Sequence, residues 1–302
     1  MRLIDRLYPC HSRSDTFTIY PLGDLHIGAR NCAEKPLRKL LKQIEGEDNA
    51  IIIGGGDWLD LIRPQDLKRF DFDTLPDWLI EGDAMTTREA MGDIVQQQVD
   101  RVVEMFYPLA KQGKVLGILA GNHEFSVKKF MGLDVQKALC RKLGVEDLTD
   151  EALIRLRFKQ CSTTQTVILY CRHGYGGGRT PGAEPNKLDR MLNEWEIADV
   201  CMTGHTHTPD ELPPKPVLEI PRKGKLPPET FCRYRYAFNW GCWVYSHAAG
   251  PSSYTSRGCF PARPLLTYKV VVKPISMARI MRNGKNFESQ CAKIEIRKIP
   301  IS

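Results

Sequence analysis

Short apolar runs alternate with amphipathic stretches along the first two thirds of the chain. Five runs have the length and the apolar character of buried strands. They are Phe17–Leu22, Ala50–Ile53, Val115–Leu119, Thr166–Tyr170 and Ala198–Met202. Other stretches repeat apolar residues at the i, i+3, i+4, i+7 spacing of a helix that buries one face, at Leu37–Ile44, Val95–Phe106 and Leu188–Trp195. Strands that alternate with helices at this spacing predict an α/β layered fold.

The rest of the chain has weaker patterns. Seven prolines fall within Pro209–Pro228, so we expect an irregular surface excursion there. Phe231–Val244 and Leu265–Lys273 are predicted strands, and the alternation over Ile294–Ile299 is typical of an edge strand. The acidic stretch Phe70–Asp83, which contains Pro and Gly, is predicted to be a surface loop.

Composition excludes several classes of protein. The chain has 302 residues, of which 42% are hydrophobic and 26% charged, as in an ordinary globular protein and unlike a disordered chain. No run approaches the roughly 18–20 apolar residues of a membrane span, and the N-terminus has no apolar signal core. The ten cysteines are spread singly with no C-x-x-C pair, so we expect reduced thiols and a cytoplasmic protein.

A short polar motif directly follows each of the five predicted strands. The motifs are Gly23-Asp24-Leu25-His26, Gly56-Asp57-Trp58-Leu59-Asp60, Gly121-Asn122-His123-Glu124, His173-Gly174 and Gly204-His205-Thr206-His207. Ligands of open α/β sheets bind at the carboxyl ends of strands, so all five motifs can converge on one site. Five of the seven histidines lie in them. Imidazole, carboxylate and amide oxygen without thiolates suit Mn(II), Fe, Zn or Ni, and more than four such ligands indicate two divalent ions.

In this order, the motifs D-x-H, G-D-x-x-D, G-N-H-E, H-G and G-H-T-H resemble those of the calcineurin-like metallophosphoesterases, over about Phe17 to Thr208. The resemblance implies an α/β fold, a four-layer α/β/β/α sandwich of two mixed sheets flanked by helices, with two metals at the strand ends. We expect residues 1–208 to form the metallophosphoesterase core, and residues 209–302 to complete the same domain.

The resemblance also implies a role for each motif residue. Three side chains would hold one metal: Asp24, His26 and His207. Three would hold the other, namely Asn122, His173 and His205, and Asp57 would bridge both ions. His123 would be the catalytic histidine, and Asp60 the carboxylate that orients it. Asn122 and His123 would contact substrate, and Arg179 in a glycine-rich stretch is a further candidate for binding phosphate.

This set of residues has a chemical reason that is independent of the resemblance. Two ions about 3.5–4 Å apart can clamp a phosphate and supply hydroxide at neutral pH by lowering the pKa of bound water. We expect metal-bound hydroxide to attack phosphorus while His123, as general acid, protonates the leaving alkoxide. Mn(II) is our first choice of metal, and Fe, Zn and Ni stay open.

The basic end of the chain favours a polyanionic substrate. The net charge is +7, and from Pro213 to Ser302 there are 16 Lys and Arg against 4 Asp and Glu, interleaved with aromatic residues that include Trp240 and Trp243. Such a segment can follow a DNA or RNA backbone and stack bases. We therefore expect a phosphodiesterase, nuclease-like in its substrate, while surface cations packed around a β layer are an equally ordinary reading.

Other members of the same family remain alternatives. A small-nucleotide phosphodiesterase or pyrophosphatase is the first of them. A protein phosphatase is less favoured, because Leu61 and Tyr175 replace the Arg and Gly of that branch. A non-catalytic scaffold is least favoured, because every expected ligand is present. The oligomeric state is left open.

Overall fold

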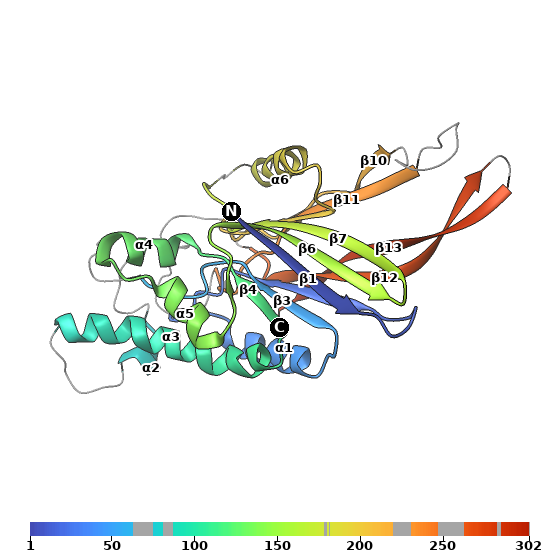
Figure 1. Ribbon diagram of the computed structural model, residues 1–302. Coiled ribbons are helices and arrows are strands. Elements are labelled where there is room, and N and C mark those ends of the chain that lie inside the picture. The colour runs from blue at the N-terminus through green and yellow to red at the C-terminus, as the bar shows by residue number, and fades with distance from the viewer. Residues whose placement is uncertain are drawn as a thin grey trace.

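The computed structural model describes residues 1–62, 75–80, 87–177, 180, 182–219, 231–246, 263–282 and 285–301. Two mixed β-sheets lie face to face in it (Figure 1). One sheet has the order β1 (Arg2–Pro9), β6 (Glu151–Gln160), β7 (Thr163–Arg172), β8 (Val200–Thr203), β11 (Phe231–Asn239), β10 (Lys215–Glu219), with β9 (Asp210–Glu211) also paired to β11. The other has the order β13 (Lys285–Pro300), β12 (Leu266–Arg282), β2 (Phe17–Leu22), β3 (Ala50–Gly54), β4 (Val115–Ile118), β5 (Glu146–Asp147).

The main core lies between the two sheets. All residues of β2 and β3 are buried, as expected for parallel strands that are covered on both faces. From one sheet Ile19 and Ile53, and from the other Leu156 and Phe238, belong to the same buried cluster. The strands that carry the predicted site are therefore anchored by side chains that point away from it.

Helices cover the two outer faces. α1 (Glu34–Glu45), α3 (Thr87–Lys111) and α5 (Val135–Leu143) pack their apolar residues on the six-stranded sheet, together with residues of the short α2 (Asp77–Ile80) and of α4 (Asn122–Met131). α6 (Ala183–Glu194) packs on the seven-stranded sheet through Leu188, Met191 and Leu192. The predicted four-layer α/β/β/α sandwich is confirmed (Figure 1).

The last third of the chain joins both sheets. β11 pairs in parallel with β8, and β12 pairs antiparallel with β2. The predicted edge strand at Ile294–Ile299 is confirmed, because it lies in β13 at the end of its sheet. In the part of the chain that the structure describes, no helix is both long and apolar enough to cross a membrane. The cysteines with described side chains are free thiols, namely Cys10, Cys32, Cys140, Cys161, Cys171, Cys201 and Cys242.

Two loop predictions were partly wrong. Pro209–Pro228 contains the strands β9 and β10 as far as it is described, up to Glu219. Pro216 is tolerated in β10 because this strand lies at the edge of its sheet, where a missing N–H need not break a ladder. Within Phe70–Asp83, residues 77–80 form α2, whereas residues 70–74 and 81–83 lie outside the described residues.

Candidate metal centre

The polar motifs converge because hydrogen bonds tie the ends of their strands together. The main-chain N–H of Asp24, after β2, donates to the carbonyl of Gly56, after β3, at 2.9 Å. Across the two sheets, Nδ1 of His173, after β7, lies 2.8 Å from the carbonyl oxygen of Gly55. The main-chain N–H of His205, after β8, donates to the Asp24 carboxylate, 3.1 Å from Oδ1 and 3.0 Å from Oδ2. The predicted convergence of the motifs is therefore present in the fold.

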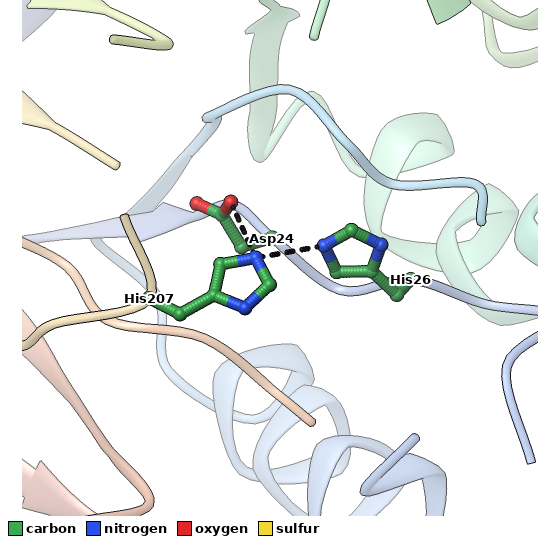
Figure 2. A group of neighbouring side chains, drawn as sticks. All are labelled: Asp24, His26 and His207. Atoms are coloured by element: carbon green, nitrogen blue, oxygen red, sulfur yellow. Dashed lines mark hydrogen bonds and ion pairs between the residues drawn. The ribbon is translucent and has the colours of Figure 1, made fainter. Parts of the chain in front are cut away.

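Asp24, His26 and His207 form one group of metal-type ligands (Figure 2). Nε2 of His207 lies 3.3 Å from Oδ1 of Asp24 and 3.0 Å from Nε2 of His26. Asp24 is fully buried, and His26 is 5% exposed. The three donor atoms lie within 4.8 Å of one another, so one ion can bind all three.

Asp57, His173 and His205 form a second group of the same kind. Oδ2 of Asp57 lies 3.2 Å from Nε2 of His173. The amide oxygen of Asn122 joins them, 3.1 Å from Nε2 of His173 and 2.7 Å from Nδ1 of His205. Because the other ring nitrogen of His173 contacts the Gly55 carbonyl, the Nε2 atom is turned toward the group, as in metal-binding histidines. The bridging role of Asp57 remains a prediction.

His123 lies beside the second group at the start of α4. Its Nε2 is 3.9 Å from Oδ2 of Asp57, and its main-chain N–H donates to Oδ1 of Asp57 at 3.0 Å. Its other ring nitrogen, Nδ1, contacts the main-chain carbonyl oxygen of Asp60. Burial lowers the pKa of His123, but the negative charges of Asp57 and Asp60 outweigh it and leave the pKa above its ordinary value. These contacts favour an imidazolium whose Nε2 proton faces the site.

Asp60 contacts two histidines of the site. Its carboxylate contacts His26, with Oδ1 3.2 Å from Nδ1 of that ring. Its main-chain carbonyl contacts His123. The carboxylate also forms a third group of metal-type ligands with His26 and His123, whose donor atoms lie within 4.8 Å of one another. The carboxylate therefore contacts a metal-type ligand directly and acts on His123 through its charge, and its role in orienting His123 stays a prediction. Arg179, the remaining candidate, lies outside the described residues.

The main chain at the site adopts conformations that side chains rarely accept. Asp24, His26, Asp57, His205 and His207 have φ values of 51°, 49°, 48°, 69° and 55°. Left-handed backbone at residues other than glycine costs of order 1–3 kcal/mol each and collects at functional sites. The hydrogen bond from His26 N–H to the Asp57 carbonyl, 3.0 Å long, helps hold two of these turns together.

Charge pairing dominates the titration of the buried groups. Burial raises the pKa of Asp57, but the charges of His173 and His123 outweigh it and hold the pKa well below the ordinary value. Burial lowers the pKa of His173, but the carboxylates, Asp57 first, raise it to about 10. His173 thus carries positive charge that faces the carboxylates, whereas burial keeps the pKa values of His26 and His205 below the ordinary value. A divalent cation bound by this group would supply that charge instead and release the proton of His173.

Comparisons with known proteins give distant likenesses only. No protein-family model matches the chain, and no curated protein matches it. It is similar to a solved structure from Streptococcus pneumoniae TIGR4 described as a conserved uncharacterised protein and predicted phosphoesterase, with 13% identity, a TM-score of 0.35, and coverage of 94% of this chain and 99% of that one.

Two structures of Vps29 from Entamoeba histolytica are also similar. The wild type complexed with zinc is 10% identical, with a TM-score of 0.29 and coverage of 95% of this chain and 100% of that one. A double mutant is 14% identical, with a TM-score of 0.25 and coverage of 64% and 88%. Because these likenesses are so distant, function must be argued from the side chains of the site.

The architecture and the order of the motifs can be compared with those expected from the sequence. Two mixed sheets pack face to face between outer helices, and the Asp, Asn and His motifs follow five strands in the expected order. This is the α/β/β/α architecture that the resemblance to the calcineurin-like metallophosphoesterases implied. Within it, the described residues form His and Asp groups that can hold metal ions.

Glu124, the last residue of the G-N-H-E motif, binds main-chain groups next to the metal-type ligands. Its buried carboxylate accepts hydrogen bonds from the main-chain N–H groups of Asp57, Leu59 and Gly121, at 3.1, 3.2 and 2.9 Å. Burial, and then the nearby charge of Asp57, raises the pKa of Glu124 to about 7. Glu124 therefore ties the loop after β3 to the start of α4, which positions Asp57 relative to His123.

Sequence reasoning missed a sixth strand end at the site. Asn239 is the last residue of β11 and Trp240 follows it, and the predicted strand Phe231–Val244 ran past both. Asn239 Nδ2 donates to the Gly204 carbonyl at 3.2 Å and to Oε1 of Glu184 at 2.7 Å. Trp240 Nε1 donates to Oδ2 of Asp24 at 2.7 Å. The polar residue after an apolar strand was the available signal, as in the other motifs.

Proposed function

We propose that this chain is a metal-dependent phosphoesterase that hydrolyses a phosphodiester. The observation that carries the proposal is the pair of metal-type groups, Asp24 with His26 and His207, and Asp57 with His173 and His205, next to His123. Neither group contains a thiolate, so the donor set fits Mn(II), Fe, Zn or Ni. Two divalent ions, when bound, would polarise phosphoryl oxygens and lower the pKa of water.

His123 is the group that moves a proton in this proposal. The carbonyl of Asp60 occupies its Nδ1, which leaves the Nε2 proton for the leaving-group oxygen of the ester. The raised pKa keeps this proton in place until the alkoxide develops. The carboxylate of Asp57, with Oδ2 3.9 Å from Nε2 of His123, stabilises the imidazolium and restricts the orientation of its ring.

Asn122 orients the substrate. Both of its histidine contacts use the amide oxygen, so Nδ2 is left to donate to a phosphoryl oxygen. Its position at the start of α4 adds the partial positive charge of a helix N-terminus, which favours a bound anion.

Nucleic acid is the proposed class of phosphodiester, but the aromatic residues that support this choice differ from those expected. Trp240 and Trp243 are each 1% exposed, so the expectation that they stack on bases is wrong. Two exposed tyrosines, Tyr234 and Tyr245, still accompany the basic charge of the last third of the chain. DNA or RNA binding through this segment remains a proposal that rests on charge and on these two rings.

A parallel activity screen tests the proposal. The protein is loaded with Mn(II) and given bis-p-nitrophenyl phosphate, p-nitrophenyl phosphate, single- and double-stranded DNA, RNA, cyclic nucleotides and a phosphopeptide, with His123→Ala as the matched inactive variant. We expect turnover of the diester and of a nucleic acid. Diester turnover without nucleic-acid cleavage would favour a small-nucleotide phosphodiesterase, and phosphopeptide turnover would favour a protein phosphatase. Metal binding without any turnover would make the chain a scaffold.

A further inference from the structure

The indole of Trp240 is buried against the metal-type ligand Asp24. It is 1% exposed, and its Nε1–H donates to Oδ2 of Asp24 at 2.7 Å. Asp24 is fully buried, so a carboxylate oxygen without this donor would have no access to water in its place. Trp240 follows β11 in one sheet and Asp24 follows β2 in the other, so the contact joins the ends of two strands that are far apart in sequence.

Three glycines, each directly after one of the strands β2, β3 and β8, make room for the ring. A Cβ added to Gly23 would lie 2.4 Å from Trp240 Nε1, and one added to Gly55 would lie 2.5 Å from Cζ2. At Gly204 the added Cβ would lie 2.2 Å from Nε1 and 2.3 Å from Oδ2 of Asp24. The glycines that precede or neighbour Asp24, Asp57 and His205 thus admit the indole beneath the site, a purpose that the motif pattern did not reveal.

The hydrogen bond also distinguishes the two oxygens of Asp24. Oδ2 accepts from Trp240, whereas Oδ1 lies 3.3 Å from Nε2 of His207. The main-chain N–H of His205 is shared by both oxygens and does not distinguish them. Trp240 therefore leaves Oδ1 facing His207, the contact that Figure 2 draws between the two side chains.

We propose that Trp240 is a positioning residue for the metal held by Asp24, His26 and His207, and that it sets the affinity of that site by fixing Oδ1 as the ligand oxygen. This inference rests on the proposed function, since it requires that the group binds a metal. Partners that orient a ligand in this way typically contribute about 10–100-fold in metal affinity.

The test compares Trp240→Phe with Trp58→Phe by calorimetric titration of the metal-free full chain with Mn(II). Trp58 is a matched control, because it is fully buried and its Nε1 donates at 2.6 Å to the main-chain carbonyl of Leu22, not to a ligand side chain. We expect Trp240→Phe to bind one of two Mn(II) ions about 10–100-fold more weakly, while Trp58→Phe keeps both affinities. Equal affinities in Trp240→Phe and the wild type would overturn the inference, and an absence of metal binding by the wild type would instead overturn the proposed function.

A second measurement needs no variant to fold. In ¹H–¹⁵N spectra of the wild type, the Trp240 indole N–H is assigned by its contacts to the α-protons of Gly23, Gly55 and Gly204. We expect this resonance to shift during titration with Zn(II) in step with occupancy of the Asp24 group, while the Trp195 indole stays in place. A Zn(II)-loaded protein with an unmoved Trp240 resonance would contradict a role in positioning the ligand.

Discussion

The carboxylate of Asp60 and the imidazole of His26 form a buried pair, with Oδ1 of the aspartate 3.2 Å from Nδ1 of the histidine. This contact turns Nε2 of His26 toward His207 and the first metal-type group. The main-chain carbonyl of Asp60 contacts His123, and the charge of its carboxylate helps to raise the pKa of that ring. One residue therefore supports the metal centre with its side chain and the general-acid candidate with its backbone and its charge.

This division of labour predicts the effect of replacing Asp60. Asp60→Asn should weaken Mn(II) binding about 10–100-fold, because the carboxylate that orients His26 is lost. At saturating Mn(II), kcat should be partly restored, because the carbonyl that holds His123 remains while one of the charges that raise its pKa is lost. Metal titration and kcat measured over a range of Mn(II) check both parts. If Asp60→Asn instead kept its metal affinity and had a kcat as low as that of His123→Ala, the Asp60 carboxylate would act mainly on His123 and not on the metal ligand His26.

His123→Ala should lower kcat by about 10²–10⁴-fold while the metal content, measured by elemental analysis, stays unchanged. The loss should be smallest for esters with a p-nitrophenolate leaving group, which needs little protonation, and largest for alkyl esters. An equal loss with every leaving group would contradict proton donation by His123.

The pH profile follows from the raised pKa of His123. A general acid works in its protonated form. Protonation of His123 should therefore not limit the rate below the pKa of this group, and the rate should fall as pH rises through that pKa. That pKa lies above the ordinary value of 6.5 because Asp57 and Asp60 outweigh burial. The alkaline fall of kcat with an alkyl diester should vanish in His123→Ala, and its persistence there would assign the fall to another group.

Glu124→Ala should destabilise the metal-free protein by several kcal/mol. Three buried main-chain N–H groups, those of Asp57, Leu59 and Gly121, lose their acceptor, at about 1–3 kcal/mol each. Glu124→Gln is the matched control and should cost less, because its amide oxygen can keep the two bonds that now go to Oε2. Urea unfolding of the two variants measures the difference, and equal losses would show that the three bonds contribute little.

The left-handed backbone at His205 predicts an unusual order of stability. At a φ of 69°, a Cβ costs roughly 1–2 kcal/mol, and glycine avoids this cost. His205→Gly should therefore be more stable than His205→Ala by about 1 kcal/mol in metal-free protein, once the greater chain entropy of glycine is allowed for. Urea unfolding compares the two variants, and a more stable alanine variant would contradict backbone strain at this position.

The sequence predicted those parts of the site that depend on local order. A strand that is buried on both faces has to end where polar residues begin, so Phe17–Leu22 and the motif after it could be placed from the pattern alone. The helix α4 was missed because it begins inside a motif that was interpreted for its chemistry. Trp240 was misassigned because its role depends on the end of β11 lying beside the end of β2 in the other sheet, a contact between distant parts of the chain. Which atom of Asp60 faces His123 depends on the turn after β3, and residue spacing cannot show it.

The proposed function requires two metal ions that act together on a phosphodiester. Its most direct test is a titration of the metal-free chain with Mn(II) while hydrolysis of bis-p-nitrophenyl phosphate is followed. We expect little turnover in the absence of metal, and a rate that rises until two ions are bound per chain. A chain that binds both ions and leaves the diester intact would contradict the proposed function.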